Sequence, residues 1–223
     1  MNTLLNINHL LFLLEGTWWT VVLTAVAFIG GGVGGLAIAL ARIAPADWMR
    51  LISGLYVQLI QGTPLLVIMF LGYFGLPALG YNVTPLTAAG ASLTIYVSAY
   101  LGEIWRGCLE AVPKAQWEAA ECLALSKTQR MFKVIMPQAI RLATPPTVGF
   151  SVQIVKNTSL ASVVGFVELA RAGQLINNSI FEPFLIYVIV AVIYFCLCFP
   201  LSVFSQRLEK TMARYGARTA DAA

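Results

Sequence analysis

Five long apolar runs, separated by short polar segments, dominate the pattern of this chain. A transmembrane helix needs about 20 mostly apolar residues to cross roughly 30 Å of hydrocarbon, and runs of this length are too long for membrane strands. We therefore expect an all-α integral membrane protein in which residues 1–223 form a single transmembrane domain. The five predicted transmembrane helices cover about residues 17–41, 51–75, 86–104, 142–166 and 184–204.

The composition agrees with a membrane environment. Hydrophobic residues make up 59% of the chain and charged residues 11%, whereas soluble domains carry about 25% charged residues. No Lys or Arg precedes Arg42, so the first run lacks the basic start of a signal peptide and is expected to be a permanent span. The four cysteines and the single histidine lack metal-ligand spacing, so we expect free thiols and no metal site.

The distribution of positive charge predicts the orientation. Of the 14 Lys and Arg residues, 12 lie within residues 42–50, 106–141 and 207–218. Loops rich in Lys and Arg stay in the cytoplasm, so an odd number of spans places the N-terminus outside and the C-terminus in the cytoplasm. The net charge of +4 follows from this topology and requires no nucleic acid partner.

A polar block interrupts the membrane pattern at about residues 112–140. Pro113 suits the first position of a helix, and the residues that follow it are good helix formers. Ser126 and Gln129 form a capping box that starts a second helix, and Pro137 is expected to end or kink that helix. Periodicity leaves two alternatives open: an amphipathic loop on the membrane surface, or a docking element for a cytoplasmic partner.

The residue types in this block favour the docking element. The block resembles the EAA motif of ABC importer permeases, with an alanine in place of the motif's glycine. The segments TPLLVIMF, AVPKAQWEAA, MPQAIR and KNTSLASVVGFVEL are similar to the polar amino acid branch of that family. The positions that carry the motif are Glu118, Ala119, Ala120, Ala124, Val134, Met136 and Pro137.

The resemblance implies a type I ABC importer permease fold with a cytoplasmic coupling helix, in the bacterial inner membrane, as a multi-pass protein in the lipid bilayer. In this family an ABC ATP-binding subunit holds the coupling helix, and a second permease subunit, identical or paralogous, completes the pathway. A periplasmic amino acid-binding protein delivers the solute. The chain itself is then expected to bind no cofactor, because ATP and Mg belong to the partner subunit. The residues expected to couple to the ATPase are Glu118, Ala119, Ala120, Leu123, Ala124 and Leu125.

The chain has no nucleotide-binding motif of its own. No stretch reads G-x-x-x-x-G-K-[ST], and the G-x-G-x-x-G within residues 30–35 lies inside the first apolar run with no strand before it. Small residues allow membrane helices to approach closely, so these glycines predict tight helix packing. We expect a transport subunit that is not an enzyme.

Two apolar runs contain polar residues at membrane depth, which is costly unless they face the bundle interior or a wet cavity. The predicted substrate pathway consists of Lys156, Asn157, Thr158, Ser159, Gln61 and Thr63. The alternatives are snorkelling of Lys156 to the interface and ordinary hydrogen bonds between helices for the others. Pro64 is expected to kink the second span, with Thr63 satisfying the freed backbone.

Glu168 and Arg171 are three residues apart on an expected short outer helix. This spacing predicts either a surface ion pair or a contact with the binding protein. The sequence as a whole predicts the permease subunit of an ATP-driven importer of a polar amino acid. The alternative is a secondary transporter of small polar solutes driven by an ion gradient, although no internal repeat or buried Asp supports it.

Overall fold

The computed structural model describes residues 6–220 of the chain, and the side chains of residues 6–212. Every regular element in that range is helical, which confirms the all-α prediction. Short π-helical segments occupy Leu71–Gly75 and Arg130–Ile135, and a 3₁₀ helix occupies Thr158–Val164. The α-helices are α1 (Ile7–Arg42), α2 (Asp47–Gln61), α3 (Leu65–Phe70), α4 (Leu76–Ala78), α5 (Pro85–Glu110), α6 (Lys114–Cys122), α7 (Lys127–Gln129), α8 (Met136–Asn157), α9 (Leu169–Ile180) and α10 (Pro183–Ala220).

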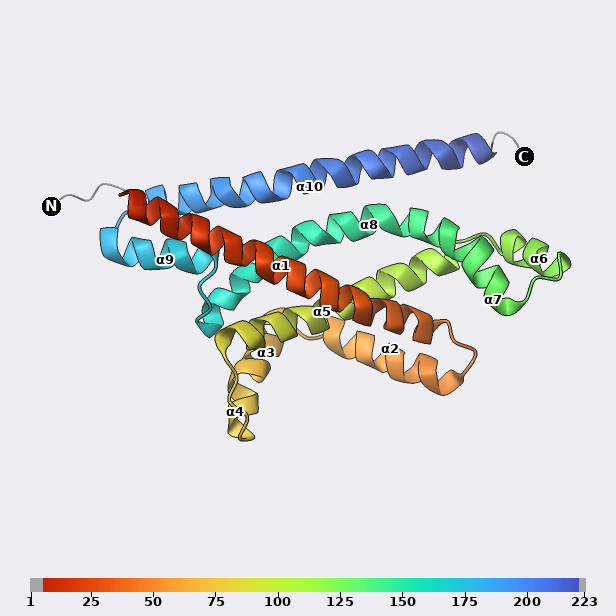
Figure 1. Ribbon diagram of the computed structural model, residues 1–223, viewed down its shortest axis with the longest axis horizontal. Helices are drawn as coiled ribbons and strands as arrows, with labels where there is room; N and C mark the ends of the chain where they lie inside the picture. The colour runs from red at the N-terminus through yellow and green to blue at the C-terminus, as the bar shows by residue number, and fades with distance from the viewer. Residues whose placement is uncertain (1–5, 221–223) are drawn as a thin grey trace.

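The long helices run lengthwise through an extended bundle (Figure 1). One end holds the start of α1, the start of α10 and the short helix α9. The opposite end holds the α6–α7 segment together with the ends of α5 and α10. The predicted polar block therefore projects from one end of the bundle, far from α9.

The number of spans is not confirmed by helix length and composition. Within residues 6–220, Ile7–Arg42 and Pro183–Met212 are long and apolar enough to cross a membrane, and the count rises to four if two bent helix pairs are each one span. The first helix also begins about ten residues before the predicted boundary, and the last continues well beyond residue 204. The five-span arrangement remains a prediction.

The glycines of α1 pack against α5, which confirms the predicted close approach. A Cβ on Gly31 would lie 2.5 Å from the Val97 side chain, and a Cβ on Gly35 would lie 3.0 Å from Leu101. From the other side, a Cβ on Gly102 would lie 2.7 Å from Ile38. Because larger side chains would separate the helices, these positions bring the two backbones together at the centre of the fold.

The second predicted span is broken, so residues 51–75 do not form one helix. Helix α2 ends at Gln61, and the helical segment Leu65–Ala78 that follows departs from its direction by 99°. Proline lacks an N–H and disfavours helical geometry in the residue before it, which explains the break at Pro64. Thr63 donates its hydroxyl to the Leu59 carbonyl at 2.7 Å, as expected for a residue that satisfies freed backbone.

The fourth predicted span differs at both ends. Helix α8 begins at Met136, and Pro137 starts it instead of ending a helix. The wide π-helical turns just before this proline accommodate its ring and its missing N–H, so the chain continues from α7 into α8. The helix then ends at Asn157, passes into the 3₁₀ segment and stops at Gly165, whose φ of +87° ends the run.

Candidate functional site

Helix α6 ends in a tight turn at the position where the motif has glycine. The Leu125 N–H donates to the Ala120 carbonyl at 3.2 Å, and the Ala124 N–H donates to the Glu121 carbonyl at 2.9 Å. This pair of bonds is the Schellman arrangement, which requires a left-handed residue. Ala124 is that residue, with a φ of +53°. The left-handed conformation costs an alanine about 1–2 kcal/mol more than it would cost a glycine. The turn therefore forms, although its central residue is strained.

The predicted capping box at the start of α7 is confirmed. The Gln129 N–H donates to Ser126 Oγ at 3.2 Å, and the Ser126 N–H donates to Gln129 Oε1 at 3.0 Å. Arg130 adds a bond from Nη1 to Glu121 Oε2 at 2.9 Å, which links the following π-helical segment back to α6. The two short helices are thus held together as one unit by local bonds.

The two faces of α6 differ in exposure. Glu118 and Ala119 are exposed, and Leu123 at the turn is 74% exposed. Ala120 instead faces inward and is 2% exposed, so its side chain supports the helix from inside and offers no outer surface. Leu125 is half-buried. The exposed side chains of Glu118 and Leu123 therefore form the outer face of this segment.

An apolar cluster joins the α6–α7 segment to the bundle. Its buried members are Leu109, Val112, Ile135 and Ala139, with Trp117 and Met131 packed against them. The cluster draws on five parts of the chain: α5, the loop after α5, α6, the π-helical segment and α8. The α6–α7 segment is therefore packed against the end of α5 and the start of α8.

A network of ion pairs lies beside this cluster, at the ends of α1 and α5. Glu103 accepts from Arg106 and lies 3.6 Å from Arg42, measured from Oε2 to Nη2. Arg106 also pairs with Glu110. This network was not predicted from the sequence, although Glu103, Arg106 and Glu110 are three and four residues apart, a spacing that favours ion pairs on one helix.

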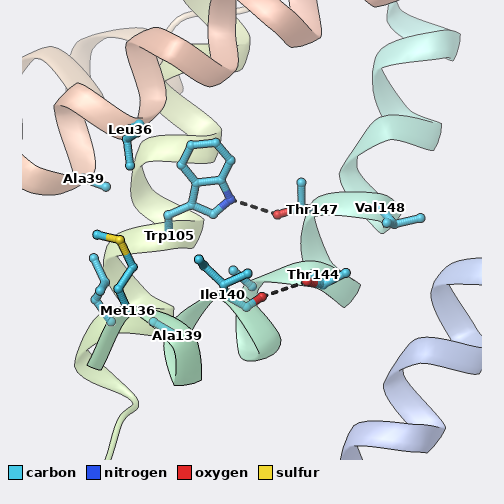
Figure 2. A pocket seen from close by; sticks show the side chains of 11 residues that line it. Leu36, Ala39, Trp105, Met136, Ala139, Ile140, Thr144, Thr147 and Val148 are labelled. Carbon is cyan, nitrogen blue, oxygen red and sulfur yellow. Dashed lines mark hydrogen bonds between the residues drawn. The ribbon is translucent and has the colours of Figure 1, made fainter. Parts of the chain in front are cut away.

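A cavity of about 390 Å³ lies between α1, α5 and α8. Figure 2 shows its lining, where Trp105 Nε1 donates to Thr147 Oγ1 at 2.9 Å. Most of the other side chains are apolar, including Leu36, Met136 and Ile140. With its principal polar groups already bonded to each other, this cavity is unsuited to a polar solute.

The predicted pathway residues lie on two broken helices that meet inside the bundle. Helix α3, just after the first break, contacts the 3₁₀ segment that follows α8. Gln61 and Lys156 are exposed, Asn157 is half-buried, and Thr158 is fully buried with its hydroxyl donated to Val155 at 2.7 Å. Thr63 and Ser159 are half-buried. Breaks in membrane helices leave backbone groups available to a solute, so this junction is the best candidate for a polar passage.

Three aromatic side chains pack together beside this junction, and they were not predicted from the sequence. The ring centroids of Tyr96 and Tyr100 are 4.4 Å apart, and those of Tyr100 and Phe150 are 5.4 Å apart. Tyr96 and Phe150 share a buried cluster with Leu65 of α3 and Ala161 of the 3₁₀ segment. The pair of tyrosines four residues apart in the third apolar run could have indicated a common face, but its pairing with Phe150 depends on how α5 and α8 pack.

The predicted surface ion pair between Glu168 and Arg171 is wrong, because Glu168 is completely buried. Its carboxylate accepts from the Ala170 and Arg171 N–H groups at 2.9 Å each, and from the Tyr194 hydroxyl at 2.8 Å. It thus caps α9 and bonds α9 to α10, and its side chain has no surface to offer a binding protein. Arg171 instead donates to Gln174 at 2.6 Å, and its contact with a binding protein stays a prediction.

Helix α9 is also bonded to α1. The Leu169 N–H donates to Thr20 Oγ1 at 3.2 Å, and the Thr20 hydroxyl donates to the Gly16 carbonyl at 3.1 Å.

The four cysteines are free thiols. Among the described residues, no group of three or more His, Cys, Asp and Glu side chains is placed to hold a metal ion.

Comparison with known proteins identifies relatives over most of the chain. Residues 31–214 match the family described as binding-protein-dependent transport system inner membrane component. The chain is 36% identical over 214 residues to the probable amino-acid ABC transporter permease protein YckA of Bacillus subtilis (strain 168), covering 96% of this chain and 95% of that protein. It is also 36% identical over 204 residues to the L-cystine transport system permease protein TcyB of the same organism, covering 91% and 87% of the two chains.

Two solved structures share the fold. A chain from the crystal structure of an amino acid ABC transporter with histidines superposes with a TM-score of 0.87 at 33% identity, covering 92% of this chain and 96% of that one. An inward-facing structure of the MetNI methionine ABC transporter gives a TM-score of 0.72 at 18% identity, covering 92% and 99% of the two chains. At that identity the second match shows the fold alone.

Proposed function

The chain belongs to the family of binding-protein-dependent transport system inner membrane components, and on this basis we propose that it is the permease subunit of an ATP-driven importer of a polar amino acid. Relatives named as amino acid and L-cystine permeases support this class of solute. The proposed location is the bacterial inner membrane.

The proposed topology has five spans with the N-terminus outside. The spans are α1, α2 with α3, α5, α8 with the 3₁₀ segment, and α10. Two observations support this arrangement. The positive charges gather at one end, and that end also carries the α6–α7 segment (Figure 1).

The exposed turn after α6 is the observation that carries the proposal. A leucine that is 74% exposed, beside an exposed glutamate, projects from the end of the bundle on a segment that matches the family motif. We assign this surface, formed by Glu118, Ala119, Leu123, Ala124 and Leu125, to the ATP-binding subunit, which holds ATP and Mg. Movement of α6 then reaches α5 and α8 through the apolar cluster beneath it.

The solute passes at the junction of the two broken helices, between this chain and a second permease subunit. Gln61, Thr63, Lys156, Asn157 and Ser159 supply polar side chains there, while the buried Thr158 supports the bend. A neutral Asn157 disfavours cationic amino acids. Asn157→Asp is therefore expected to shift uptake toward cationic amino acids, and unchanged selectivity in competition uptake would count against this assignment.

Transport requires that ATP and the loaded binding protein each favour one state of the pathway over the other. If ATP or the binding protein bound the inward-facing and outward-facing states equally tightly, its binding would change the population of neither state. By linkage, delivery of the amino acid must also change the affinity of the complex for nucleotide. Arg171, on α9 at the outer end of the bundle, is the proposed contact for the binding protein.

Co-purification with the ATP-binding subunit tests the proposal. Glu118→Lys and Leu123→Asp alter exposed positions and should leave the permease folded, whereas a substitution at the buried Ala120 would not. Loss of a buried leucine contact costs about 1.5–3 kcal/mol, so we expect Leu123→Asp to weaken association by at least about tenfold. Glu209→Lys, an exposed position on α10 with the same charge change, is the matched control and should retain the ATPase.

Two results would contradict the proposal. If both variants retain the ATPase as well as the control does, this segment is not the coupling element. If the wild-type permease binds no ATPase at all, an ion-gradient-driven transporter becomes the leading function.

A further inference from the structure

A groove between the end of α1 and the start of α2 has no role in the function proposed above. Its volume is about 660 Å³. It lies at the end of the bundle that carries the positive charges and the α6–α7 segment (Figure 1). The residues that line it are Arg42, Asp47, Trp48, Arg50, Leu51, Gly54, Leu55 and Gln58.

The guanidinium of Arg42 packs over a glycine in this groove. A Cβ on Gly54 would lie 2.7 Å from Arg42 Nη1, so the guanidinium lies directly against the backbone of α2. Arg42 Nη2 lies 3.6 Å from Glu103, a carboxylate that Arg106 already occupies more closely. Arg42 keeps 26% of its side chain exposed and lines the groove, so its guanidinium has further N–H groups to offer an acceptor there.

The start of α2 adds further donors beside it. The N-cap residue is Ala46, which has no side-chain oxygen to accept from the first N–H groups of this 15-residue helix. Arg50 bonds the Ala44 carbonyl at 3.0 Å and pairs with Asp47, so it braces the loop while keeping 47% of its side chain exposed. The lining of the groove contains two arginines and one aspartate, so it carries a net positive charge. This charge and the positive end of α2 both favour an anion.

The rest of the groove is apolar and exposed. Trp48, Leu51 and Leu55 are 65%, 64% and 56% exposed, and tryptophan is typical of the level of lipid headgroups. A second hollow of about 330 Å³ shares Trp48 as a wall and is lined mainly by apolar side chains, including Ile38, Ala41 and Ile52. The surface thus changes from cationic to apolar over a short distance, which matches the chemistry of a phospholipid.

We propose that this groove binds an anionic phospholipid of the cytoplasmic leaflet. The phosphate contacts Arg42, Arg50 and the start of α2, and an acyl chain lies against Trp48 and Leu51. Basic pockets between transmembrane helices on the cytoplasmic side suit such headgroups. This inference rests on the proposed topology, which places the groove on the cytoplasmic side.

The test is lipid binding to the purified transporter complex, measured by native mass spectrometry. The probes are phosphatidylglycerol, phosphatidylethanolamine and inorganic phosphate. We expect selective binding of phosphatidylglycerol, weakened about fivefold by each of Arg42→Gln and Arg50→Gln. Arg141→Gln, which removes an exposed arginine of α8 outside the groove, is the matched control and should bind as the wild type does. Arg50→Gln leaves the Glu103 ion pairs intact, so it tests the site even if Arg42→Gln fails to fold.

Three results would overturn the proposal. Equal binding of phosphatidylglycerol by all three variants would mean that the lipid is held by the bulk surface. Competition by millimolar inorganic phosphate would identify a site for a soluble anion. Failure of phosphatidylglycerol with brominated acyl chains to quench the fluorescence of Trp48, with Trp48→Phe as the reference, would mean that another subunit covers the groove.

The same preparations separate this proposal from the proposed function. Arg50→Gln is expected to bind phosphatidylglycerol about fivefold more weakly while retaining the ATP-binding subunit. If the wild-type permease did not co-purify with the ATP-binding subunit but still bound phosphatidylglycerol selectively, only the transport proposal would be contradicted.

Discussion

Glu168 is expected to be the most sensitive polar position at the outer end of the bundle. Its carboxylate is fully buried and receives three donors: two backbone N–H groups of α9 and the hydroxyl of Tyr194. Burial of a carboxylate costs several kcal/mol, and three charge-assisted hydrogen bonds of about 1.5–3 kcal/mol each offset that cost. Glu168→Gln keeps the shape and removes the charge, so it isolates the hydrogen bonding.

The magnitude follows from counting donors and acceptors. A glutamine amide has one acceptor oxygen and an NH₂ group, so at least one of the three donors must face another donor. One buried donor without a partner costs about 1–3 kcal/mol. For a chain of this size, each kcal/mol lowers Tm by about 2–4 °C, which gives a decrease of about 4–8 °C for a cost near 2 kcal/mol.

Thermal unfolding of the purified permease in detergent measures this effect. Glu182→Gln, an exposed position just before α10, is the control for charge removal and should leave Tm unchanged. Tyr194→Phe removes one of the three donors, so Tyr194→Phe combined with Glu168→Gln should cost less than the sum of the two single changes. A Tm for Glu168→Gln equal to that of the wild type would refute the reasoning, because it would mean that the three donors do not require a carboxylate.

Three further changes probe the turn, the helix contact and the cavity. Ala124→Gly relieves a left-handed alanine and should stabilise the α6 turn by up to about 1 kcal/mol, seen as roughly fivefold slower amide hydrogen exchange; faster exchange would argue against strain there. Gly31→Ala places a Cβ 2.5 Å from a side chain of α5 and should cost about 1–3 kcal/mol in thermal unfolding. Gly32→Ala, with its nearest atom at 3.8 Å, should cost nothing, and equal losses at the two glycines would contradict the packing argument. Thr147→Val leaves the indole N–H of Trp105 without its partner and should lower the free energy of unfolding by about 1–3 kcal/mol; an unchanged Tm would contradict this.

The features that the sequence predicted correctly depend on near neighbours in the chain. The capping box of Ser126 and Gln129 forms because its two partners are three residues apart and need only one helical turn. Thr63 bonds the carbonyl four residues before it for the same reason. The glycines of the first run predicted a close contact, since small residues have little other use inside a membrane helix.

The features that the sequence did not predict depend on residues brought together from distant elements. The break after Gln61 was expected only as a kink, because the size of a bend at proline is set by what the next helix packs against. Glu168 was placed at the surface because its nearest charged residue in the chain is Arg171. Its actual partner across the fold, Tyr194, lies 26 residues away.

The sequence by itself therefore determined the apolar character of the spans, the helical class and the family, since each depends on composition or on short, fixed spacings. Only the tertiary structure decided which polar side chains are exposed, which are buried, and which meet. Tyr96 and Tyr100 of α5 stack on Phe150 of α8, and Arg42 of α1 lies over Gly54 of α2, because each pair of helices packs at one particular register. That register is the result of all the side-chain contacts along both helices together, and no local stretch of either helix contains it.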